Sequence, residues 1–487
     1  MRTLIRGGYV VGFDWDIKSH VVYPDGEVVY RGNEIEFVGR GFEGPVDHTI
    51  DASDALITPG FINAHSCMDL LTIQFSLDVQ KEHHGKPIGN LRKRALLNCG
   101  TEGLLSPAEI RNGAMLAFYN MVRGGTTTMA GITSYGFKGW NDPIWEPEIY
   151  LEASVKSGLR AYLSHMFRDR IDGQIDRQKG EEGLSRSIRF IERYHGSFGD
   201  RVRGLLFPYT FDSVSAETLQ ETRDVANDLG VGIRMHFAQS EKEVHLIDQI
   251  YQTTPVNALE DLGFLGPDVL LTHCLYPAGL NPSKNTLEES LATLVRHGTN
   301  VGHCPWVLLL LDHGPLLLNS LTRYGEAGIN VCLGTDAFPQ DIIREMRWAA
   351  IMAKVAHGAR GGVGTAREVF DAATINGARW LGRDDLGRLT KGAKADINII
   401  NLTAPNMGPV TDPIQNLVYF GQSHNVKTVI VDGVKVVDQF RHLSLDGKTL
   451  VRQSEGTFDR MRDYWIQWDE TGKLTKDDLP PPAYPMR

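Results

Sequence analysis

The chain has 487 residues, of which 42% are hydrophobic and 23% are charged, and its formal net charge is −10. This composition is that of a globular protein with a sizeable core and room for a second module, and it excludes a disordered chain. The acidic balance argues against a nucleic-acid partner, and no apolar run reaches the about 20 residues that a membrane span needs.

The amino-terminal residues and the cysteines predict where the protein works. The opening MRTLIRGGYVVGFDWD reaches acidic residues too early for the apolar core of a signal peptide. Five cysteines, at positions 67, 99, 274, 304 and 332, do not suggest a paired secreted framework. We therefore expect a cytoplasmic protein with no membrane partner. We also expect a homo-oligomer, whose size the sequence does not define.

Both ends of the chain have the alternating pattern of short strands. Strand-like stretches occur at 3–5, 9–11, 28–30 and 34–39, and the pattern returns at 395–400 and 428–437. The two ends are therefore predicted to form one composite β-sandwich domain from residues 1–57 and 384–487. The alternative is two unrelated small domains.

Residues 58–383 alternate between strand-like and helix-like stretches. Eight candidate strands lie at 58–64, 126–130, 160–167, 202–209, 231–238, 269–274, 300–305 and 329–337. Helical patterns lie between them, as at 107–123 and 215–230. The order and size predict a (β/α)8 TIM barrel, so the fold class is α/β. Residues 71–105, with His83, His84 and Cys99, are expected to form a long first loop over the site.

Four of these strands end in residues that can bind a metal. They are His65 (with Cys67 two positions later), His236, His273 and Asp336. In a barrel the carboxyl ends of the strands converge at one mouth, so these residues would meet there. Imidazole and carboxylate suit Zn²⁺, Fe²⁺ or Co²⁺, and such an ion activates water. Each residue taken alone could instead be a buried, hydrogen-bonded side chain.

Short motifs follow one another in a recognisable order. They are 59–65 (PGFINAH), 124–128 (GGTTT), 273–274 (HC), 303–305 (HCP), 334–336 (GTD) and 431–433 (VDG). With them the chain resembles the metal-dependent amidohydrolase superfamily, in particular its branch of atrazine/triazine chlorohydrolases and cytosine- or guanine-deaminase-like enzymes. The resemblance spans nearly the whole chain and implies a barrel with a composite β-sandwich domain.

The resemblance also implies the roles of the strand-end residues. One divalent transition metal, zinc first and iron or cobalt as alternatives, is expected at His65, Cys67, His236 and Asp336. Asp336 would accept the proton of the attacking water, with His273 as a second catalytic residue. No lysine ends the fourth strand at 206–209, so a lysine-bridged pair of metals is not expected.

Cys67 stands where the family has the second histidine of an HxH pair. A thiolate is a good zinc ligand, and Cys67 shares a strand face with His65. Alternatively Cys67 only packs, and water fills its position around the metal. Asp69 is a third candidate if the strand continues that far.

Gln239 stands where deaminase-like members have the glutamate of a His-x-x-Glu motif, which shuttles a proton to the leaving nitrogen. An amide cannot do this, so Gln239 is expected to orient the substrate or the water. Reactions that release chloride or thiolate would be slowed least by the missing glutamate, because these groups leave without protonation. Glu241 and Glu243 follow closely and are expected mostly as surface charges.

Three further residues are predicted to contact a small-molecule substrate. His165 ends the third strand, His303 ends the seventh, and Trp306 follows His303 and makes that side of the pocket more apolar. The two histidines could instead support the metal ligands.

Together these features predict a metal-dependent hydrolase of a small organic molecule. It would cleave a C–N, C–S or C–Cl bond in a urea, thiocarbamate, amide or substituted heterocycle. One alternative is an aminohydrolase (deaminase) of an aminated heterocycle. The other is a catalytically degraded barrel that binds a ligand without turnover.

Overall fold

The computed structural model describes residues 1–67, 105–133, 141–171, 173–281, 283–310, 320–358, 361–467, 475 and 484. Asp69, His83, His84, Cys99 and almost all of the predicted first loop lie outside the described residues. Among the helices of the described ranges, none combines the length and the hydropathy that a bilayer crossing requires.

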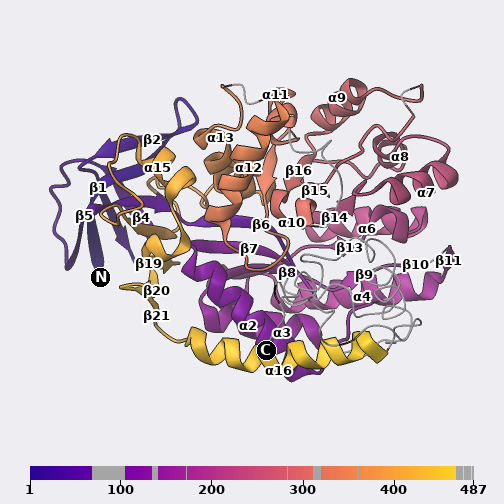
Figure 1. Cartoon of the computed structure of the whole chain (residues 1–487), viewed down its shortest axis with the longest axis horizontal. Coiled ribbons are helices and arrows are strands. Elements are labelled where there is room, and N and C mark those ends of the chain that lie inside the picture. Colours follow the sequence, from indigo (N-terminus) through magenta and orange to yellow (C-terminus); the bar gives the residue numbers. More distant parts are fainter. Residues whose placement is uncertain are drawn as a thin grey trace.

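A nine-stranded sheet combines strands from both ends of the chain (Figure 1). Its strands are β1 (Arg2–Asp14), β2 (Ser19–Pro24), β3 (Glu27–Arg31), β4 (Glu34–Gly39), β5 (His48–Pro59), β18 (Ile397–Asn401), β19 (Val426–Val431), β20 (Val434–Asp438) and β21 (Arg441–His442). Strand β18 pairs antiparallel with β5, with Ile399 opposite Ile57, and both side chains are buried. The predicted boundaries at 57 and 384 and the description as a sandwich stay predictions.

Parallel strands form the centre of the remaining chain. One four-stranded sheet contains β6 (Phe61–Cys67), β7 (Thr126–Ile132), β8 (Arg160–Leu163) and β12 (Val202–Gly204); the other contains β14 (Ile233–Phe237), β15 (Val269–His273), β16 (Asn300–His303) and β17 (Val331–Leu333). Isolated parallel bridges join the two sheets, Ser66 to Asp336 at one seam and Leu206 to Ile233 and Thr210 to His236 at the other. The carboxyl ends of the strands therefore lie on one side.

The predicted strands differ from the observed ones in their bounds, and three of them are shifted or interrupted. The first begins at Phe61, because Thr58 and Pro59 complete β5 and pair with β18. The third is interrupted after Leu163 and resumes as β9 (Met166–Phe167). The fourth is interrupted after Gly204 and resumes as β13 (Phe207–Pro208), which pairs with β9. A short hairpin, β10 (Arg170–Ile171) and β11 (Gln174–Ile175), follows β9.

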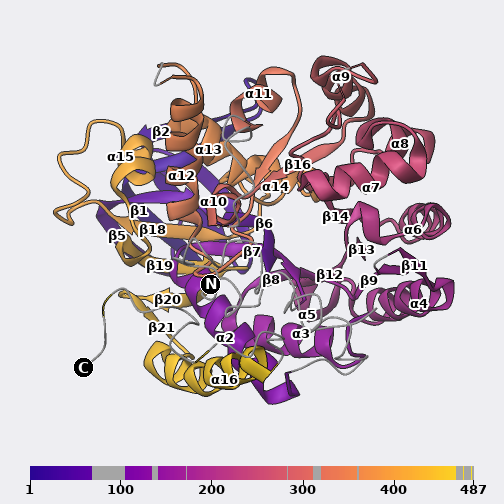
Figure 2. The same ribbon diagram turned by 45° about the vertical axis from the view of Figure 1, so that its right-hand side comes forward.

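Helices cover the outside of the parallel strands (Figures 1 and 2). They are α2 (Pro107–Arg123), α3 (Glu146–Ser157), α4 (Arg177–Tyr194), α5 (Ser197–Asp200), α6 (Ala216–Leu229), α7 (Glu241–Tyr251), α8 (Pro255–Asp261), α9 (Leu287–His297), α10 (Pro305–Leu310), α11 (Ser320–Glu326), α12 (Ile342–Ala356), α13 (Ala366–Ala372) and α14 (Ile375–Trp380). Helix α2 has the predicted bounds, because Ser106 caps it and an apolar face with Ile110 and Phe118 packs inward.

The carboxyl-terminal part adds two helices to its strands. Helix α15 (Pro413–Phe420) lies between β18 and β19 in the sequence, and the long helix α16 (Gly447–Gln467) follows β21. In Figure 1, α16 runs beside α2 and α3, and Arg460 forms an ion pair with Glu109 of α2. Helix α16 therefore contacts the helices around the parallel strands rather than extending the sheet.

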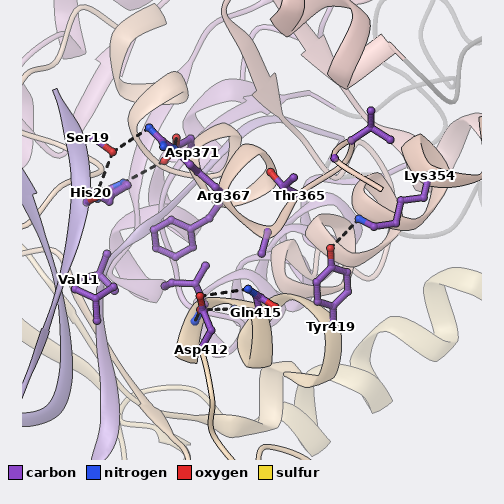
Figure 3. Close-up of a pocket in the computed structure, with 16 residues that line it drawn as sticks. Val11, Ser19, His20, Lys354, Thr365, Arg367, Asp371, Asp412, Gln415 and Tyr419 are labelled. Carbon is purple, nitrogen blue, oxygen red and sulfur yellow. Dashed lines mark hydrogen bonds and ion pairs between the residues drawn. The ribbon is translucent and has the colours of Figure 1, made fainter. Parts of the chain in front are cut away.

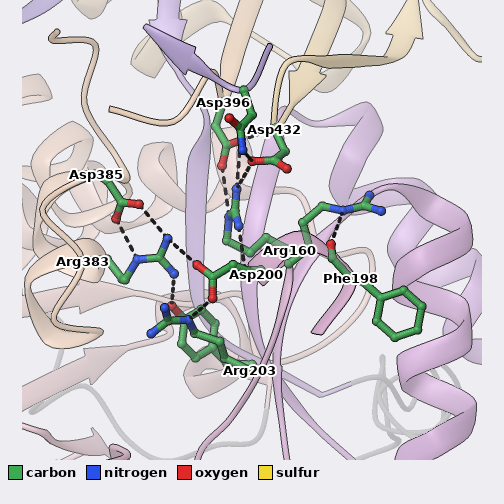
Figure 4. A network of polar contacts seen from close by, with 11 residues as sticks. Arg160, Phe198, Asp200, Arg203, Arg383, Asp385, Asp396 and Asp432 are labelled. Carbon is green, nitrogen blue, oxygen red and sulfur yellow. Dashed lines mark hydrogen bonds and ion pairs between the residues drawn. The ribbon is translucent and has the colours of Figure 1, made fainter. Parts of the chain in front are cut away.

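A buried ion-pair network, called here the Arg160 network, joins the nine-stranded sheet to the parallel strands (Figure 4). Arg160 on β8 is fully buried, and its guanidinium lies 3.4 Å from Asp396 and 3.3 Å from Asp432. It also donates to the carbonyl of Asp200 at 2.9 Å. Burial alone would lower the pKa of Arg160, but the carboxylates of Asp396 and Asp432 outweigh it and raise that pKa. The network keeps a charged group satisfied inside the protein.

Candidate metal centre

Three histidines from different strands meet at the carboxyl ends of the parallel strands. They are His65 on β6, His236 on β14 and His273 on β15, and their ligand atoms all lie within 4.8 Å of one another. The carboxylate of Asp336 is adjacent, because Oδ1 lies 3.5 Å from Nε2 of His65 and Oδ2 lies 3.5 Å from Nε2 of His273. Four of the predicted residues are thus brought together.

The backbone around these residues is sharply bent. His273 and Asp336 have φ angles of 73° and 53°, in the left-handed region that most residues avoid. The backbone N–H of Asp336 donates to the carbonyl of His65 at 2.9 Å, which ties the end of β17 to β6. A Cβ added to Gly334 would lie 2.7 Å from Cβ of His65, so this close approach requires glycine. Strained residues held by their surroundings are typical of functional sites.

The imidazoles are oriented and kept neutral. Nδ1 of His236 lies 2.8 Å from the carbonyl of Tyr209, so it carries the proton and leaves a lone pair on Nε2. Nδ1 of His65 lies 3.1 Å from Oγ1 of Thr272. Burial lowers the pKa of His236 to about 3 and holds that of His65 well below its ordinary value. Neutral rings with their other nitrogen engaged are the state in which histidine binds metals.

A divalent transition metal fits this donor set. Nε2 of His65 is buried and has no hydrogen-bond partner among the described residues. Three ring nitrogens within 4.8 Å of one another, with a carboxylate beside them, match the ligand types that zinc takes in catalytic sites.

Arg234 is a buried residue of this region that the sequence reasoning missed. It lies on β14 two residues before His236, donates to the carbonyls of Ala130 at 2.5 Å and Gly131 at 2.6 Å, and is fully buried. Burial lowers its pKa to about 9. Its positive charge helps to depress the pKa of His65 and His236. The period of two along a strand would have placed it on the face of His236.

Cys67 is close in sequence but lies outside the group of mutually close ligand atoms. It is buried in an apolar cluster that also contains Ile132 and Met166. Its backbone N–H donates to the carbonyl of Asp336 at 2.5 Å, and its carbonyl accepts from Gln340 at 2.5 Å. This placement favours the packing alternative for its thiol.

Gln239 follows β14 and is half-buried. Glu241 is exposed, as predicted, but the expectation of a surface charge is wrong for Glu243, which is only 3% exposed. The Glu243 carboxylate turns back toward the strand and accepts the backbone N–H groups of Ala238 at 2.8 Å and Gln239 at 2.7 Å. Burial raises the pKa of Glu243 well above its ordinary value.

His165 follows β8 and is buried next to helix α4. Its ring centroid lies 6.1 Å from that of Phe190 on α4, and it lines a hollow of about 520 Å³ with residues of α3 and α4. The interruption between β8 and β9 lets it turn toward these helices. The predicted substrate contact of His165 stays a prediction.

His303 ends β16, and Trp306 lies at the start of α10. Nδ1 of His303 lies 2.9 Å from Oγ of Ser320, and burial lowers its pKa to about 4. The half-buried Trp306 donates its indole N–H to the carbonyl of Phe338 at 3.3 Å, and the guanidinium of Arg344 lies 4.4 Å from its ring centroid. Their substrate contacts stay predictions.

Comparisons with known proteins agree with this geometry. The sequence profile of the Amidohydrolase family matches residues 56–436. A 5'-deoxyadenosine deaminase of Methanosarcina acetivorans is 29% identical over 463 residues, which cover 93% of this chain and 96% of the relative. A 5-methylthioadenosine/S-adenosylhomocysteine deaminase of Thermococcus kodakarensis is 32% identical over 442 residues, with 89% and 93% covered.

Solved structures share the fold. An adenosine deaminase of Xanthomonas campestris with bound zinc superposes with a TM-score of 0.77 at 22% identity, covering 95% of this chain and 98% of the other. Atrazine chlorohydrolase TrzN of Arthrobacter aurescens TC1, complexed with zinc, gives 0.78 at 23% identity, with 94% and 100% covered.

Proposed function

This chain belongs to the amidohydrolase family, and from that premise we propose that it is a metal-dependent deaminase of an adenosine-type heterocycle, with 5'-deoxyadenosine as the first substrate to test. The support comes from the two deaminase relatives, each of which aligns along at least 89% of the chain. The observation that carries the chemistry is the group of His65, His236 and His273 with the Asp336 carboxylate 3.5 Å from two of them.

The proposed roles follow from these positions. His65, His236 and His273 hold one divalent ion with Asp336 beside it, and zinc is the first choice over iron and cobalt. When bound, the ion lowers the pKa of water toward neutrality. Asp336 accepts the proton of the attacking water on a carboxylate oxygen. Because Gln239 cannot return a proton, Asp336 must also deliver one to the departing nitrogen.

The finer architecture belongs to the same proposal. The bridges between Ser66 and Asp336 and between Leu206 and Ile233 support closure of the two parallel sheets into a (β/α)8 barrel. The pairing of β5 with β18 supports one composite domain from both chain ends. We also propose that the protein is cytoplasmic and forms a homo-oligomer.

The experiment measures metal and turnover on the same preparation. Protein purified without chelators is analysed for metals, then assayed for ammonia release from 5'-deoxyadenosine and 5'-methylthioadenosine with Zn²⁺, Fe²⁺ or Co²⁺. We expect about one metal per chain and metal-dependent ammonia release. Absence of a bound metal, even after reconstitution, would instead favour the ligand-binding alternative without turnover.

A second candidate is hydrolysis of a substrate whose leaving group needs no proton. Gln239 favours it, because an amide cannot protonate a departing amine, and the shared fold with atrazine chlorohydrolase TrzN is compatible with it. A chlorinated triazine in the same assay separates the two candidates. Chloride release without ammonia release from either nucleoside would replace the deaminase proposal.

A further inference from the structure

Helix α7 begins with a sequence that ordinarily forms a capping box. Ser240 is its N-cap residue and Glu243 occupies the third helical position. In a capping box the glutamate side chain accepts the backbone N–H of the N-cap residue. Helices α2, α9 and α13 follow this rule, with Glu109, Glu289 and Glu368 accepting that N–H at 2.8, 2.7 and 2.6 Å.

Glu243 breaks the rule. Its two oxygens accept the N–H groups of Ala238 and Gln239, which precede the N-cap residue and directly follow β14. Ser240 already caps the helix by accepting the N–H of Glu243 at 3.2 Å. The carboxylate is also buried, whereas Glu289 of α9 is exposed. Helix α7 is capped by Ser240 without the Glu243 carboxylate, whereas the two N–H groups after β14 both use that carboxylate as their acceptor.

The strand end needs such support. Ala238 has a φ of 46°, and a residue other than glycine keeps this conformation only when its surroundings impose it. The charge of Asp212 adds to burial in raising the pKa of Glu243. The carboxylate therefore stands in an unfavourable electrostatic environment, where two N–H donors hold it.

We propose that Glu243 is a positioning residue of the metal centre: by holding both N–H groups after β14, it sets where the Gln239 side chain lies relative to His236. This inference rests on the proposed function, in which Gln239 orients the substrate or the attacking water. Gln239 is three residues from His236, so a shift of the bend would displace it directly.

The variant E243Q tests this inference. Its amide oxygen can accept one N–H, but its NH₂ group faces the other donor. With 5'-deoxyadenosine we expect kcat to fall about 10–100-fold, as for other groups that orient a metal site, with a much smaller change in KM. Hydrogen exchange at the amides of Ala238 and Gln239 should become faster.

The control E289Q makes the same change in an ordinary capping box on α9. It should leave kcat and the exchange of both amides unchanged. A merely structural role for Glu243 predicts that the two variants behave alike, with any loss of activity following the loss of folded protein in thermal unfolding. That outcome would overturn the inference.

A double-mutant cycle with Q239A identifies the route of the effect. If Glu243 acts through Gln239, E243Q should lower kcat far less in the Q239A background than in the wild type. Equal fold-losses in both backgrounds would contradict the inference. If the wild type turns over neither nucleoside, the proposed function fails and hydrogen exchange alone tests the inference. Unchanged protection of the Ala238 and Gln239 amides in E243Q would then overturn it. Lost protection of these amides would support it.

Discussion

The protein has two buried polar regions that treat their charges in opposite ways. In the Arg160 network, a fully buried guanidinium is matched by Asp396, Asp432 and a backbone carbonyl. At the metal centre, the ligand atoms of three imidazoles lie within 4.8 Å of one another, and Nε2 of His65 has no hydrogen-bond partner among the described residues. The charged groups of the Arg160 network therefore find all these partners within the chain.

This difference separates groups that stabilise the fold from groups that await a ligand. A buried polar group without a partner costs free energy, so its presence calls for an explanation. In the Arg160 network the explanation is that the buried charges pair with one another. At the strand ends the proposed explanation is an external ion. The comparison therefore predicts that changes in the two regions affect different measurements.

The largest effect is expected from D336N. It removes the carboxylate that accepts the proton and should lower kcat/KM about 10²–10⁴-fold. The Arg160 network is untouched, so the denaturant midpoint should stay close to that of the wild type. Steady-state kinetics and urea unfolding of the same preparation check both statements. Normal turnover in D336N would remove Asp336 from the mechanism.

A change in the Arg160 network should have the opposite effect, with stability lost and the metal site retained. R160A leaves the carboxylates of Asp396 and Asp432 without their buried partner and should cost about 3–5 kcal/mol of unfolding free energy. Metal content per folded chain should be unchanged. R296A, which breaks an exposed pair with Glu260, is the control and should cost less than about 1 kcal/mol. Equal effects of R160A and R296A in urea unfolding would contradict the contrast.

A pH effect is expected where the sheet meets α13. His20 lines a hollow of about 410 Å³ with Asp371, 3.8 Å away (Figure 3). Burial lowers the pKa of His20 to about 4, so its contribution to stability is lost as the pH falls from 6.5 toward 4. Burial raises the pKa of Asp371 to about 6, so protonation there stabilises the fold as the pH falls, and the two trends oppose each other.

The variant D371N isolates the histidine. We expect D371N to lose up to about 3 kcal/mol of stability between pH 6.5 and pH 4 because of the lowered pKa of His20, whereas the wild type, in which Asp371 opposes this trend, should lose much less. Urea unfolding at several pH values measures this loss. The charges of Arg367 and Arg388, which also lower the pKa of His20, remain in the variant. A pH dependence identical to that of the wild type would rule out the opposing pair.

Metal binding should stabilise the fold by a smaller amount. Zinc at about 100 times its dissociation constant should add about 2.7 kcal/mol, because it binds only the folded chain. H236A should abolish this gain, whereas R160A should retain it although it starts from a lower stability. Thermal unfolding with zinc and with a chelator measures both. A gain that survives in H236A would place the metal elsewhere.

The smallest effect is expected from C67A. Because Cys67 belongs to an apolar cluster and lies outside the mutually close ligand atoms, its loss should cost about 1 kcal/mol and leave metal content unchanged. Metal analysis after dialysis checks this. Loss of metal in C67A would make the thiol a ligand after all.

Residues that close apolar runs were predictable from the sequence, whereas the direction in which a side chain turns after an interruption or a helix start was not. His65, His236, His273 and Asp336 each close an apolar run, and parallel strands bring such positions together. His165 was also expected at the strand ends; after the interruption at Leu163 its ring lies near Phe190 of α4, and its substrate contact stays a prediction. Glu243 was expected on the surface, because hydrophobic periodicity does not show that a side chain will turn back to the preceding strand.

The pairing of β5 with β18 has a consequence for synthesis of the protein. Strand β5 ends at Pro59, whereas its neighbour β18 begins only at Ile397. At about 5–20 residues per second, a ribosome needs on the order of tens of seconds to make the intervening chain. Throughout that time one edge of β5 lacks its partner, and open edges recruit other strands. We therefore expect nascent chains that end before β18 to need protection by chaperones.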